Sequence, residues 1–276
     1  MSAHVYPAPA KLNLFLHVTG RRADGYHLLQ TVFRFIDYGD ALHFRSRSDG
    51  QIILSQPLPG VPLEQDLSYR AARLLQTTAG TTQGVEIRLE KRLPLGGGLG
   101  GGSSDAATTL IALNRLWGTG LSRAELMALG LTLGADVPVF LFGDNAWAEG
   151  VGERLTPITL EPAWYVVLVP PVSVATAEVF SAPELTRNTL PVTIPAFSAG
   201  QIHNDLELVV TGRYPSVARH LEWLRQYGVA RMTGSGACVF AAFTAEQAAR
   251  EVWADKPAWI EGFVARGLDH HPLRDF

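Results

Sequence analysis

Six glycines occupy seven consecutive positions, 96 to 102, within the segment Pro94–Ser104. Such a run is a poor choice for the interior of a strand or helix, because glycine loses the most conformational freedom on folding. Its use is access, since backbone N–H groups can approach a ligand where no Cβ atoms intervene. An alternating strand pattern over residues 84–93 precedes the run, and a helical pattern over 104–117 follows it. The N-terminus of that helix adds unpaired N–H groups, so the segment predicts a cradle for a di- or triphosphate.

Other glycine-rich loops fit this segment less well. A flexible linker is not expected between a strand and a helix that follow each other so closely. A P-loop requires a Gly-Lys pair, which the chain lacks, and a protein kinase requires His-Arg-Asp and Asp-Phe-Gly, which it also lacks. The spacing Gly96, Gly98, Gly101 fits the dinucleotide fingerprint, but a second helix follows where a strand is needed. Ser103 and Ser104 are candidates for capping the helix or for binding phosphate or Mg²⁺.

Composition restricts the class of protein. With 276 residues, 47% hydrophobic and 18% charged, the chain can bury the core of two domains or of one large mixed fold. Its net charge of −3 argues against broad nucleic-acid or anionic-membrane binding. The single cysteine, Cys238, excludes an intrachain disulfide and a cysteine-based zinc site. The N-terminus lacks the pattern of a signal peptide, and no run of about 18 apolar residues occurs, so a cytoplasmic protein is expected.

The order of elements suggests two α+β domains, 1–160 and 161–276. The first half predicts strands at 11–18 and 28–44 (interrupted at Gly39-Asp40), a helix at 66–78, a helix from the Ser122–Glu125 capping box to Gly134, and short strands at 136–142 and 146–149. The second half predicts strands at 164–169 and 259–267, helices at 204–211, 216–227 and 245–254, and two apolar pieces around Gly234–Gly236. This order is typical of a ferredoxin-like fold.

Lysine is scarce: only Lys11, Lys91 and Lys256 occur, against twenty arginines. Lys11 begins an apolar strand with Asn13 on the same face. On spacing alone, a surface position is favoured for Lys11 over a placed charge. Asp136 lies in Gly134-Ala-Asp-Val-Pro138, where a turn or capping role is favoured over a catalytic one.

Four segments together resemble the GHMP kinases, the superfamily of galactokinase, homoserine kinase and mevalonate kinase. They are residues 7–13, 94–107, 134–140 and 233–238, and the similarity extends from about Pro7 to Leu273. The segment Arg22-Ala-Asp-Gly-Tyr-His27 narrows the resemblance to the members whose substrate is 4-diphosphocytidyl-2-C-methyl-D-erythritol. The resemblance implies a ribosomal-protein-S5-like N-terminal domain, a ferredoxin-like C-terminal domain and an active site in the cleft between them.

The function implied by the resemblance is ATP-dependent phosphorylation of the 2-hydroxyl of that substrate, in the non-mevalonate route to isoprenoid precursors. Transfer would be direct, with Asp136 accepting the hydroxyl proton and Lys11 stabilising the developing charge. The ATP-binding residues would be Pro94, Leu95, Gly96, Gly97, Gly98, Leu99, Gly100, Gly101, Gly102, Ser103 and Ser104. The substrate-binding residues would be Asn13, Tyr26, His27, Phe33, Thr176 and Phe180. Another GHMP kinase of the homoserine or mevalonate type is the alternative.

Several positions remain open at this level. Mg²⁺ is expected as a cofactor because it screens triphosphate charge, but its protein ligands are not identified. Asp66 stands where the family usually has Asn, near the expected adenine site. Residues 203–207 suggest a helix start capped by Asn204 or Asp205, with a substrate contact as the alternative. Cys238 is expected to be a small buried residue. The expected partners are small molecules, with neither nucleic acid nor membrane, and a monomer and a homodimer remain equally open.

Overall fold

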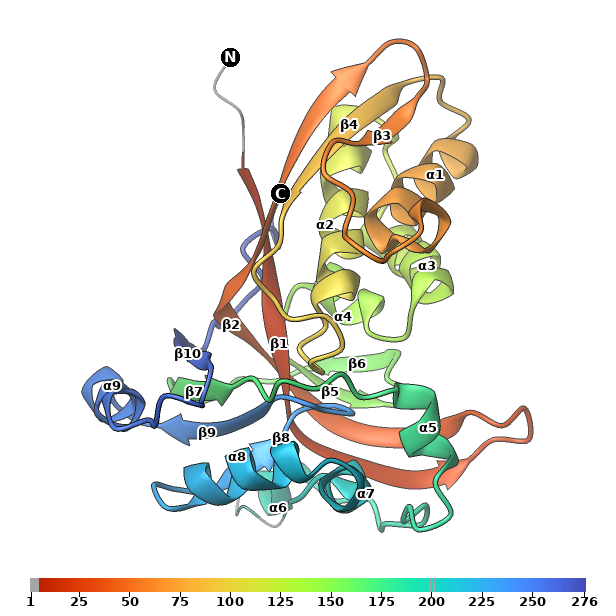
Figure 1. The fold of residues 1–276 in the computed structure, drawn as a ribbon. Coiled ribbons are helices and arrows are strands. Elements are labelled where there is room, and N and C mark those ends of the chain that lie inside the picture. The colour runs from red at the N-terminus through yellow and green to blue at the C-terminus, as the bar shows by residue number, and fades with distance from the viewer. Residues whose placement is uncertain (1–4, 199, 201) are drawn as a thin grey trace.

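A computed structural model describes residues 5–198, 200 and 202–276. The first four residues, which carry part of the targeting expectation, lie outside the described residues. Figure 1 shows two sheets joined by one long hairpin, with helices α1 to α4 beside the upper sheet and α7 and α8 below the lower one. The mixed architecture with two sheets confirms the predicted α+β class.

The elements have the following bounds. The strands are β1 (Val5–Arg21), β2 (His27–Arg47), β3 (Ile52–Leu54), β4 (Gly84–Glu90), β5 (Ala146–Glu149), β6 (Arg154–Pro157), β7 (Trp164–Leu168), β8 (Ala230–Met232), β9 (Val239–Phe243) and β10 (Gly262–Arg266). The helices are α1 (Leu67–Ala79), α2 (Gly101–Leu116), α3 (Arg123–Leu133), α4 (Val137–Phe142), α5 (Thr176–Ser181), α6 (Ile194–Ser198), α7 (Asp205–Arg213), α8 (Pro215–Arg225) and α9 (Glu246–Ala254), with a short 3-10 helix at Leu63–Gln65.

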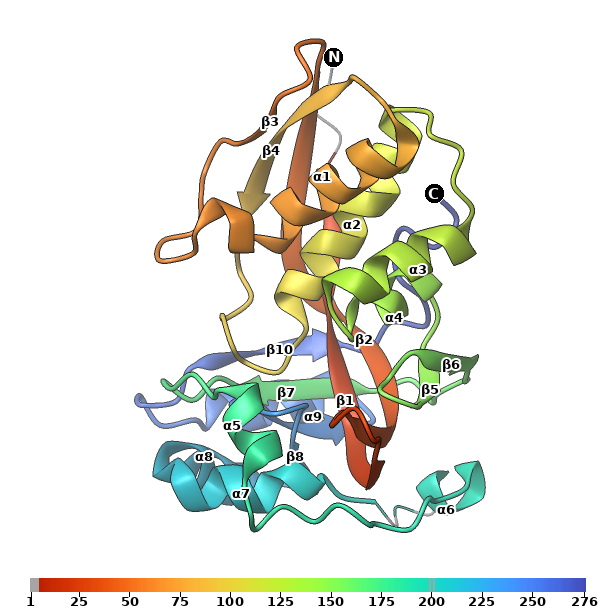
Figure 2. The same ribbon diagram turned by 90° about the vertical axis from the view of Figure 1, so that its right-hand side faces the viewer.

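The hairpin of β1 and β2 connects the two halves of the molecule. The strands pair antiparallel from Val5 opposite His43 to Arg21 opposite His27, with a register shift between Asn13 and Leu16. The predicted strands at 11–18 and 28–44 are therefore parts of longer ones. The expected interruption at Gly39-Asp40 is wrong, because both residues pair with β1 within the continuous β2. Figures 1 and 2 show this hairpin extending from the upper sheet past the lower one.

The second sheet has the strand order β10-β7-β9-β8, and all three neighbouring pairs are antiparallel. In chain order this is fourth, first, third, second, which is the order of a ferredoxin-like sheet and confirms that prediction. The connection from β7 to β8 contains α5 to α8, and α9 lies between β9 and β10. Strands β7, β9 and β10 each contribute residues both to the core beneath these helices and to the core that contains Leu12 of the hairpin.

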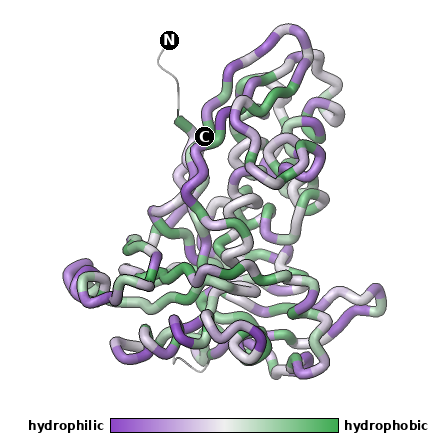
Figure 3. The backbone as a smooth tube through the Cα atoms, in the orientation of Figure 1, coloured by the Kyte–Doolittle hydropathy of each residue, from purple (hydrophilic) through white to green (hydrophobic). Residues whose placement is uncertain are grey.

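Alternation along β7 separates two cores. Val166 and Leu168 pack with α7, α8 and α9, whereas Tyr165 and Val167 pack against Leu12 of β1. Alternate residues of a strand point to opposite faces, so β7 is buried on both sides and joins the two halves. Figure 3 shows hydrophobic segments gathered where the hairpin passes the lower sheet, while the hairpin tip is hydrophilic.

The segment 136–142 was expected to be a strand and is instead helix α4 (Val137–Phe142). Its residues from Val137 to Leu141 are all buried, so no alternation of apolar and polar residues distinguishes the two structures. Pro138 stands in the first turn and Gly143 adopts the left-handed conformation at the C-cap. These are the positions that proline and glycine favour at the two ends of a helix.

The end of the chain returns to the first half. The boundary expected after residue 160 falls in the connection between β6 and β7, yet Leu273 and Phe276 pack into the core formed by α2 and α4. Among the residues that the structure describes, no helix combines the length and apolar character needed to cross a lipid bilayer.

Burial of His271 predicts a loss of stability in acid. Its Nδ1 accepts a hydrogen bond of 3.0 Å from the backbone N–H of Leu273, and its ring packs edge-on against Phe35. Burial, with a smaller effect of the Arg123 charge, lowers the pKa of His271 to about 3. In the unfolded chain His271 takes up a proton near pH 6.5, whereas in the folded protein it stays neutral until about pH 3. The contribution of the neutral, buried His271 to the free energy of unfolding is therefore complete above pH 6.5 and is lost as the pH falls below that value.

We therefore expect His271→Asn, which keeps an acceptor for Leu273, to remove this part of the pH dependence. The difference in unfolding free energy between wild type and variant should narrow by about 2 kcal/mol between pH 7 and pH 5. Urea unfolding followed by circular dichroism at several pH values measures it. A difference that stays constant with pH would show that His271 takes up its proton in the folded protein.

Candidate active site

Lys11 and Asp136 meet in one pocket. Lys11 Nζ lies 3.1 Å from Asp136 Oδ2, and the Lys11 side chain is 3% exposed against 37% for Asp136. The surface position favoured for Lys11 on spacing alone is therefore wrong. Asp136 occupies the N-cap position of α4, but its side chain makes no capping hydrogen bond. Its carboxylate is directed toward the lysine and remains open to a ligand.

Three neighbours hold the Lys11 ammonium in place. Nζ donates hydrogen bonds of 2.6 Å to Asn13 Oδ1 and 3.0 Å to the carbonyl oxygen of Gly98, and it lies 5.5 Å from the ring centroid of Phe33. Asn13 Nδ2 in turn donates to Thr31 Oγ1 at 3.0 Å. The Asn13 side chain thus orients Lys11, and one amide hydrogen remains for a ligand.

The glycine run folds tightly over this lysine. At Gly98 a Cβ atom would lie 2.3 Å from the carbonyl oxygen of Thr233, and at Gly100 it would lie 3.0 Å from Lys11 Cε. Both residues also have positive φ, 75° and 72°, which other residues rarely adopt. The backbone N–H of Lys11 donates to the carbonyl of Leu99 at 3.0 Å. Glycine at these positions therefore lets the loop and the lysine share one small volume.

Helix α2 begins directly after this loop. Its first intrahelical bond runs from Ser104 N to the carbonyl of Gly100 at 2.8 Å, which leaves the N–H groups of residues 101–103 without helical partners. Ser103 lines the pocket. Ser104 does not: it is fully buried and its hydroxyl donates to the carbonyl of Pro9 at 2.7 Å. The expectation that Ser104 could bind phosphate or cap the helix is corrected, since Gly100 is the N-cap.

Two apolar residues of the glycine segment also differ in role. Leu99 is 1% exposed and packs with Leu12 and Cys238, so it anchors the loop. Leu95 is 54% exposed. Cys238 is buried as predicted, and burial raises the pKa of its thiol to about 12, which argues against a nucleophilic role.

The pocket around Lys11 is a cavity of about 340 Å³. It brings together predicted residues from distant parts of the chain: Lys11, Asn13, Phe33, Gly96, Gly98, Ser103, Asp136, Thr176 and Phe180. A turn at residues 234–236 closes one side, and the Asn204 amide holds this turn by donating to the carbonyls of Met232 and Gly234. Asn204 also caps α7, which confirms the predicted helix start.

A second cavity, of about 530 Å³, contains the other predicted substrate residues. Tyr26 and His27 line it from the hairpin end and Phe180 from α5, with the His27 and Phe180 rings 5.0 Å apart. Tyr26 is 65% exposed. The two cavities share a set of lining residues, so they form one continuous cleft: Leu29, Ala135, Val151, Thr176 and Phe180.

Comparison with known proteins identifies the family to which the chain belongs. The N-terminal and C-terminal domain models of the GHMP kinases match residues 66–144 and 194–256. A protein of Nitrosospira multiformis named 4-diphosphocytidyl-2-C-methyl-D-erythritol kinase is 66% identical over 273 residues, covering 98% of this chain and 93% of that protein. The chain belongs to this kinase family. The similarly named protein of Thiobacillus denitrificans is also 66% identical, and the match covers 99% of each chain.

Solved structures agree with this family. A crystal structure of 4-(cytidine 5'-diphospho)-2C-methyl-D-erythritol kinase superposes on the kinase with a TM-score of 0.83 at 36% identity, covering 96% of this chain and 99% of that one. The mevalonate kinase of Methanococcus jannaschii, at 18% identity and a TM-score of 0.68, shares the fold. The predicted resemblance to the GHMP kinases is confirmed, and the chain is an ATP-dependent small-molecule kinase.

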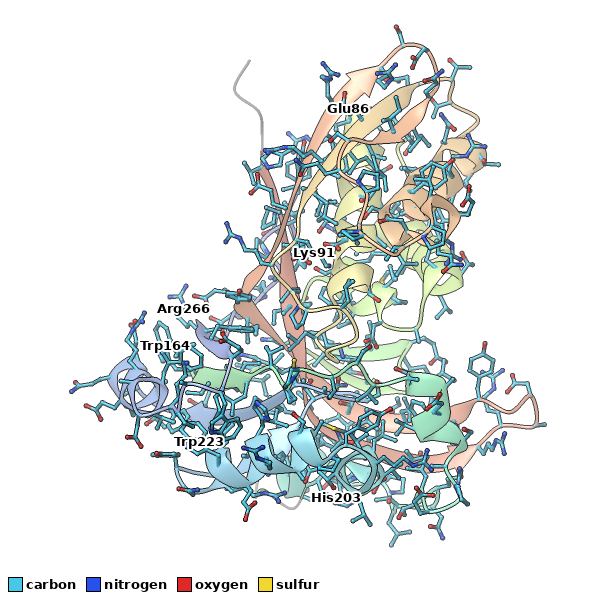
Figure 4. All side chains as sticks on the ribbon, viewed as in Figure 1. Glu86, Lys91, Trp164, His203, Trp223 and Arg266 are labelled. Carbon is cyan, nitrogen blue, oxygen red and sulfur yellow. The ribbon has the colours of Figure 1, made fainter. Side chains whose placement is uncertain are left out.

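One charged cluster of the kinase was missed by the sequence analysis. Lys91 Nζ lies 2.6 Å from Asp40 and 2.7 Å from Asp105, beneath the first turns of α2, and is labelled in Figure 4. Asp40 also accepts the backbone N–H groups of Arg92 and Leu93. Burial raises the pKa of Asp105 to about 8, against the opposing charge of Lys91. This cluster ties the strand before the glycine run to the helix after it.

Asp66 stands at the start of α1, near the expected adenine site. Asp66 accepts hydrogen bonds from the backbone of Ser68 and Tyr69 and is 5% exposed, so it caps α1. Its contact with adenine stays a prediction. The described part of the chain contains no group of three or more His, Cys, Asp or Glu side chains placed to hold a metal ion.

Proposed function

We propose that the kinase transfers the γ-phosphoryl group of ATP to the 2-hydroxyl of 4-diphosphocytidyl-2-C-methyl-D-erythritol, with Asp136 and Lys11 as its catalytic residues. The observation that carries the proposal is the buried ammonium of Lys11 beside a partly open carboxylate, in a cleft that continues to the Tyr26 and His27 cavity. This reaction belongs to isoprenoid precursor biosynthesis. Because ATP is the donor, we propose a cytoplasmic site of action, with small molecules as the partners.

Asp136 acts on the proton of the acceptor. Its carboxylate takes the proton from the 2-hydroxyl while the oxygen forms a bond to the γ-phosphorus and the bond to the β-phosphate oxygen breaks, releasing ADP. Because the side chain is 37% exposed, the proton can then pass to solvent. No phosphorylated enzyme forms.

Lys11 acts on charge. Opposite unit charges about 4 Å apart attract by roughly 4 kcal/mol at an effective dielectric near 20, so an ammonium fixed at 3.1 Å from Asp136 also stabilises negative charge developing on the acceptor and phosphoryl oxygens. Asn13, Gly98 and Phe33 position it before substrate arrives. That preorganisation lowers the barrier because little reorganisation is needed during transfer.

The glycine run and α2 hold the triphosphate. The N–H groups of residues 101–103 have no partner within α2 and lie at its N-terminus, which favours anions. Mg²⁺ fits the oxygen groups of this cavity, the Ser103 hydroxyl and the Asp136 carboxylate, because Mg²⁺ is usually held by one or two protein oxygens together with phosphate oxygens and waters. Ser103 and Asp136 line the first cavity and would be the protein groups beside it. When bound, the ion screens the triphosphate charge.

A direct assay tests the proposal. Purified protein is incubated with ATP, Mg²⁺ and, separately, the cytidyl-methylerythritol alcohol, homoserine or mevalonate, and products are identified by mass. ADP formation with one added phosphoryl group on the cytidyl substrate alone is expected. Phosphorylation of homoserine or mevalonate instead would assign the chain to another activity of the superfamily.

Removing the Tyr26 ring is expected to weaken cytidine binding. Base–aromatic stacking contributes roughly 1–3 kcal/mol, so Tyr26→Ala should raise KM for the cytidyl substrate by about 5- to 150-fold, with kcat and the KM for ATP little changed. Tyr26→Phe is the matched control, since it keeps the ring and should retain the wild-type KM. Equal KM values for all three proteins would place the cytosine elsewhere.

A further inference from the structure

Arg187 lies in the loop after α5, and no motif of the sequence marks it. Its guanidinium donates hydrogen bonds to three backbone carbonyls: Phe180 at 3.0 Å, Ala182 at 2.6 Å and Leu185 at 3.0 Å. These bonds hold the guanidinium in one orientation, because its donors form a rigid planar fork. Nε lies in the plane of the same fork, so its N–H also points in a fixed direction.

That direction is toward the ring of His27. Arg187 Nε donates to His27 Nε2 at 3.2 Å, across 160 positions of sequence. The His27 ring packs on Phe180, whose own carbonyl Arg187 holds. Arg187 thus connects two residues that line the second cavity, one from the hairpin and one from α5.

This contact restricts the protonation of His27. Arginine stays protonated and only donates, so His27 Nε2 must carry a lone pair. The single ring hydrogen of the neutral imidazole is then on Nδ1. Nδ1 forms no hydrogen bond within residues 5–198, 200 and 202–276, so it is available to a ligand. Burial and the charges of Arg187 and Arg21 lower the pKa of His27, which also favours the neutral ring.

We propose that Arg187 is a positioning residue that fixes His27 as the Nδ1–H tautomer, and that this fixed donor makes the site select cytosine over uracil. The inference rests on the proposed function for its substrate, but its structural part concerns the free protein. N3 of cytosine is a hydrogen-bond acceptor, whereas N3 of uracil carries a hydrogen. A His27 Nδ1–H that cannot change tautomer can donate to N3 of cytosine. With uracil, the Nδ1–H and the N3–H would face each other as two donors with no acceptor between them.

The tautomer can be tested without any substrate. Protein labelled with ¹⁵N-histidine gives distinct shifts for protonated and unprotonated ring nitrogens, and His27→Gln identifies the His27 signals by their loss. A protonated Nδ1 and an unprotonated Nε2 are expected in the wild type at neutral pH. In Arg187→Met a mixture containing the Nε2–H form is expected. A wild-type ring protonated on Nε2, or a Met variant with an unchanged pattern, would overturn the inference.

Arg213 provides a matched control. It contacts the same segment, with Nε 2.9 Å from Glu184 Oε1 and Nη1 3.4 Å from the carbonyl of Glu178, but it does not touch His27. Arg213→Met should therefore keep the wild-type tautomer. If it changed the His27 signals as Arg187→Met does, general loosening of α5 would explain both, and the specific role of Arg187 would be refuted.

Kinetics test the selectivity. The ratio of kcat/KM for the cytidyl substrate to that for its uridine analogue should fall roughly 10- to 100-fold in Arg187→Met, mostly through KM, and stay unchanged in Arg213→Met. Arg187→Lys, which keeps a donor, should restore part of the ratio. If Arg187→Met changed the tautomer of His27 but left the kcat/KM ratio of the two substrates unchanged, the proposed link between tautomer and base selectivity would be refuted. If wild type phosphorylates neither substrate, the proposed function fails, whereas the NMR result still decides the tautomer.

Discussion

Asp136→Asn is expected to reduce kcat by about 10²- to 10⁴-fold while ATP binding is retained. The amide has the shape of the carboxylate, but it cannot accept a proton from the substrate hydroxyl. The fold should be preserved, because the Asp136 side chain makes no capping hydrogen bond to α4 and is partly exposed. Steady-state turnover at saturating substrates and calorimetric titration with a non-hydrolysable ATP analogue measure the two quantities.

Asp49→Asn is a suitable control for loss of a carboxylate. Asp49 lies between β2 and β3 and pairs with Arg47, away from the cleft. Its turnover should equal that of the wild type. Near-normal kcat in the Asp136 variant would refute the assignment of a base, whereas loss of nucleotide binding would show that the charge of Asp136 serves ATP instead.

The glycine run could be interpreted from sequence because its composition has few structural uses. Six glycines before a helical pattern predict an anion cradle, and in the structure Gly100 packs on Lys11 while the next three N–H groups, 101–103, have no partner within α2. The sequence could not show which serine faces the ligand. Ser103 and Ser104 are adjacent, but successive helical positions differ by about 100° around the axis, so one lines the pocket and the other bonds Pro9.

The role of Lys11 depends on long-range pairing. Its strand alternates as predicted, yet both faces are buried, since Leu12 contacts the second sheet while Lys11 and Asn13 face the cleft. Lys11 lies inside β1, and its ammonium is buried because Asp136 and the glycine loop pack against it. The pairing of Lys11 with Asp136 was available from the family resemblance, not from local pattern.

Two other features had no local signal. Thr31, which supports Asn13, comes from the partner strand of the hairpin, 18 positions further along the chain. Arg187 contacts His27 across 160 positions, and although His27 belongs to the predicted segment 22–27, no sequence motif marks Arg187 as its partner. Such partners are determined by tertiary packing, which short-range periodicity does not encode.

Lys11→Met is expected to lower kcat by about 10³-fold or more, because the ammonium contacts both the proposed base and the oxygens on which charge develops. Methionine has a similar length, and Asp136 stays hydrated through its exposed side, so the variant should fold. Lys11→Arg should not restore activity, because the glycine loop leaves little room around the lysine for a larger guanidinium. Lys11 Cε lies 3.0 Å from the point that a Cβ on Gly100 would occupy. Lys256→Met, in the loop just after α9, is the control, with wild-type kcat expected.

The double variant Lys11→Met/Asp136→Asn separates a joint action from two independent ones. If the two groups act as a unit on one proton and one phosphoryl group, the double variant should be about as slow as the slower single variant. If the loss of kcat in the double variant equalled the product of the two single losses, lysine and carboxylate would serve separate steps. The assignment of both groups to one shared site would then be wrong. Melting temperatures of all four proteins exclude unfolding as the cause, since a folded variant that binds ATP and does not turn over has lost chemistry alone.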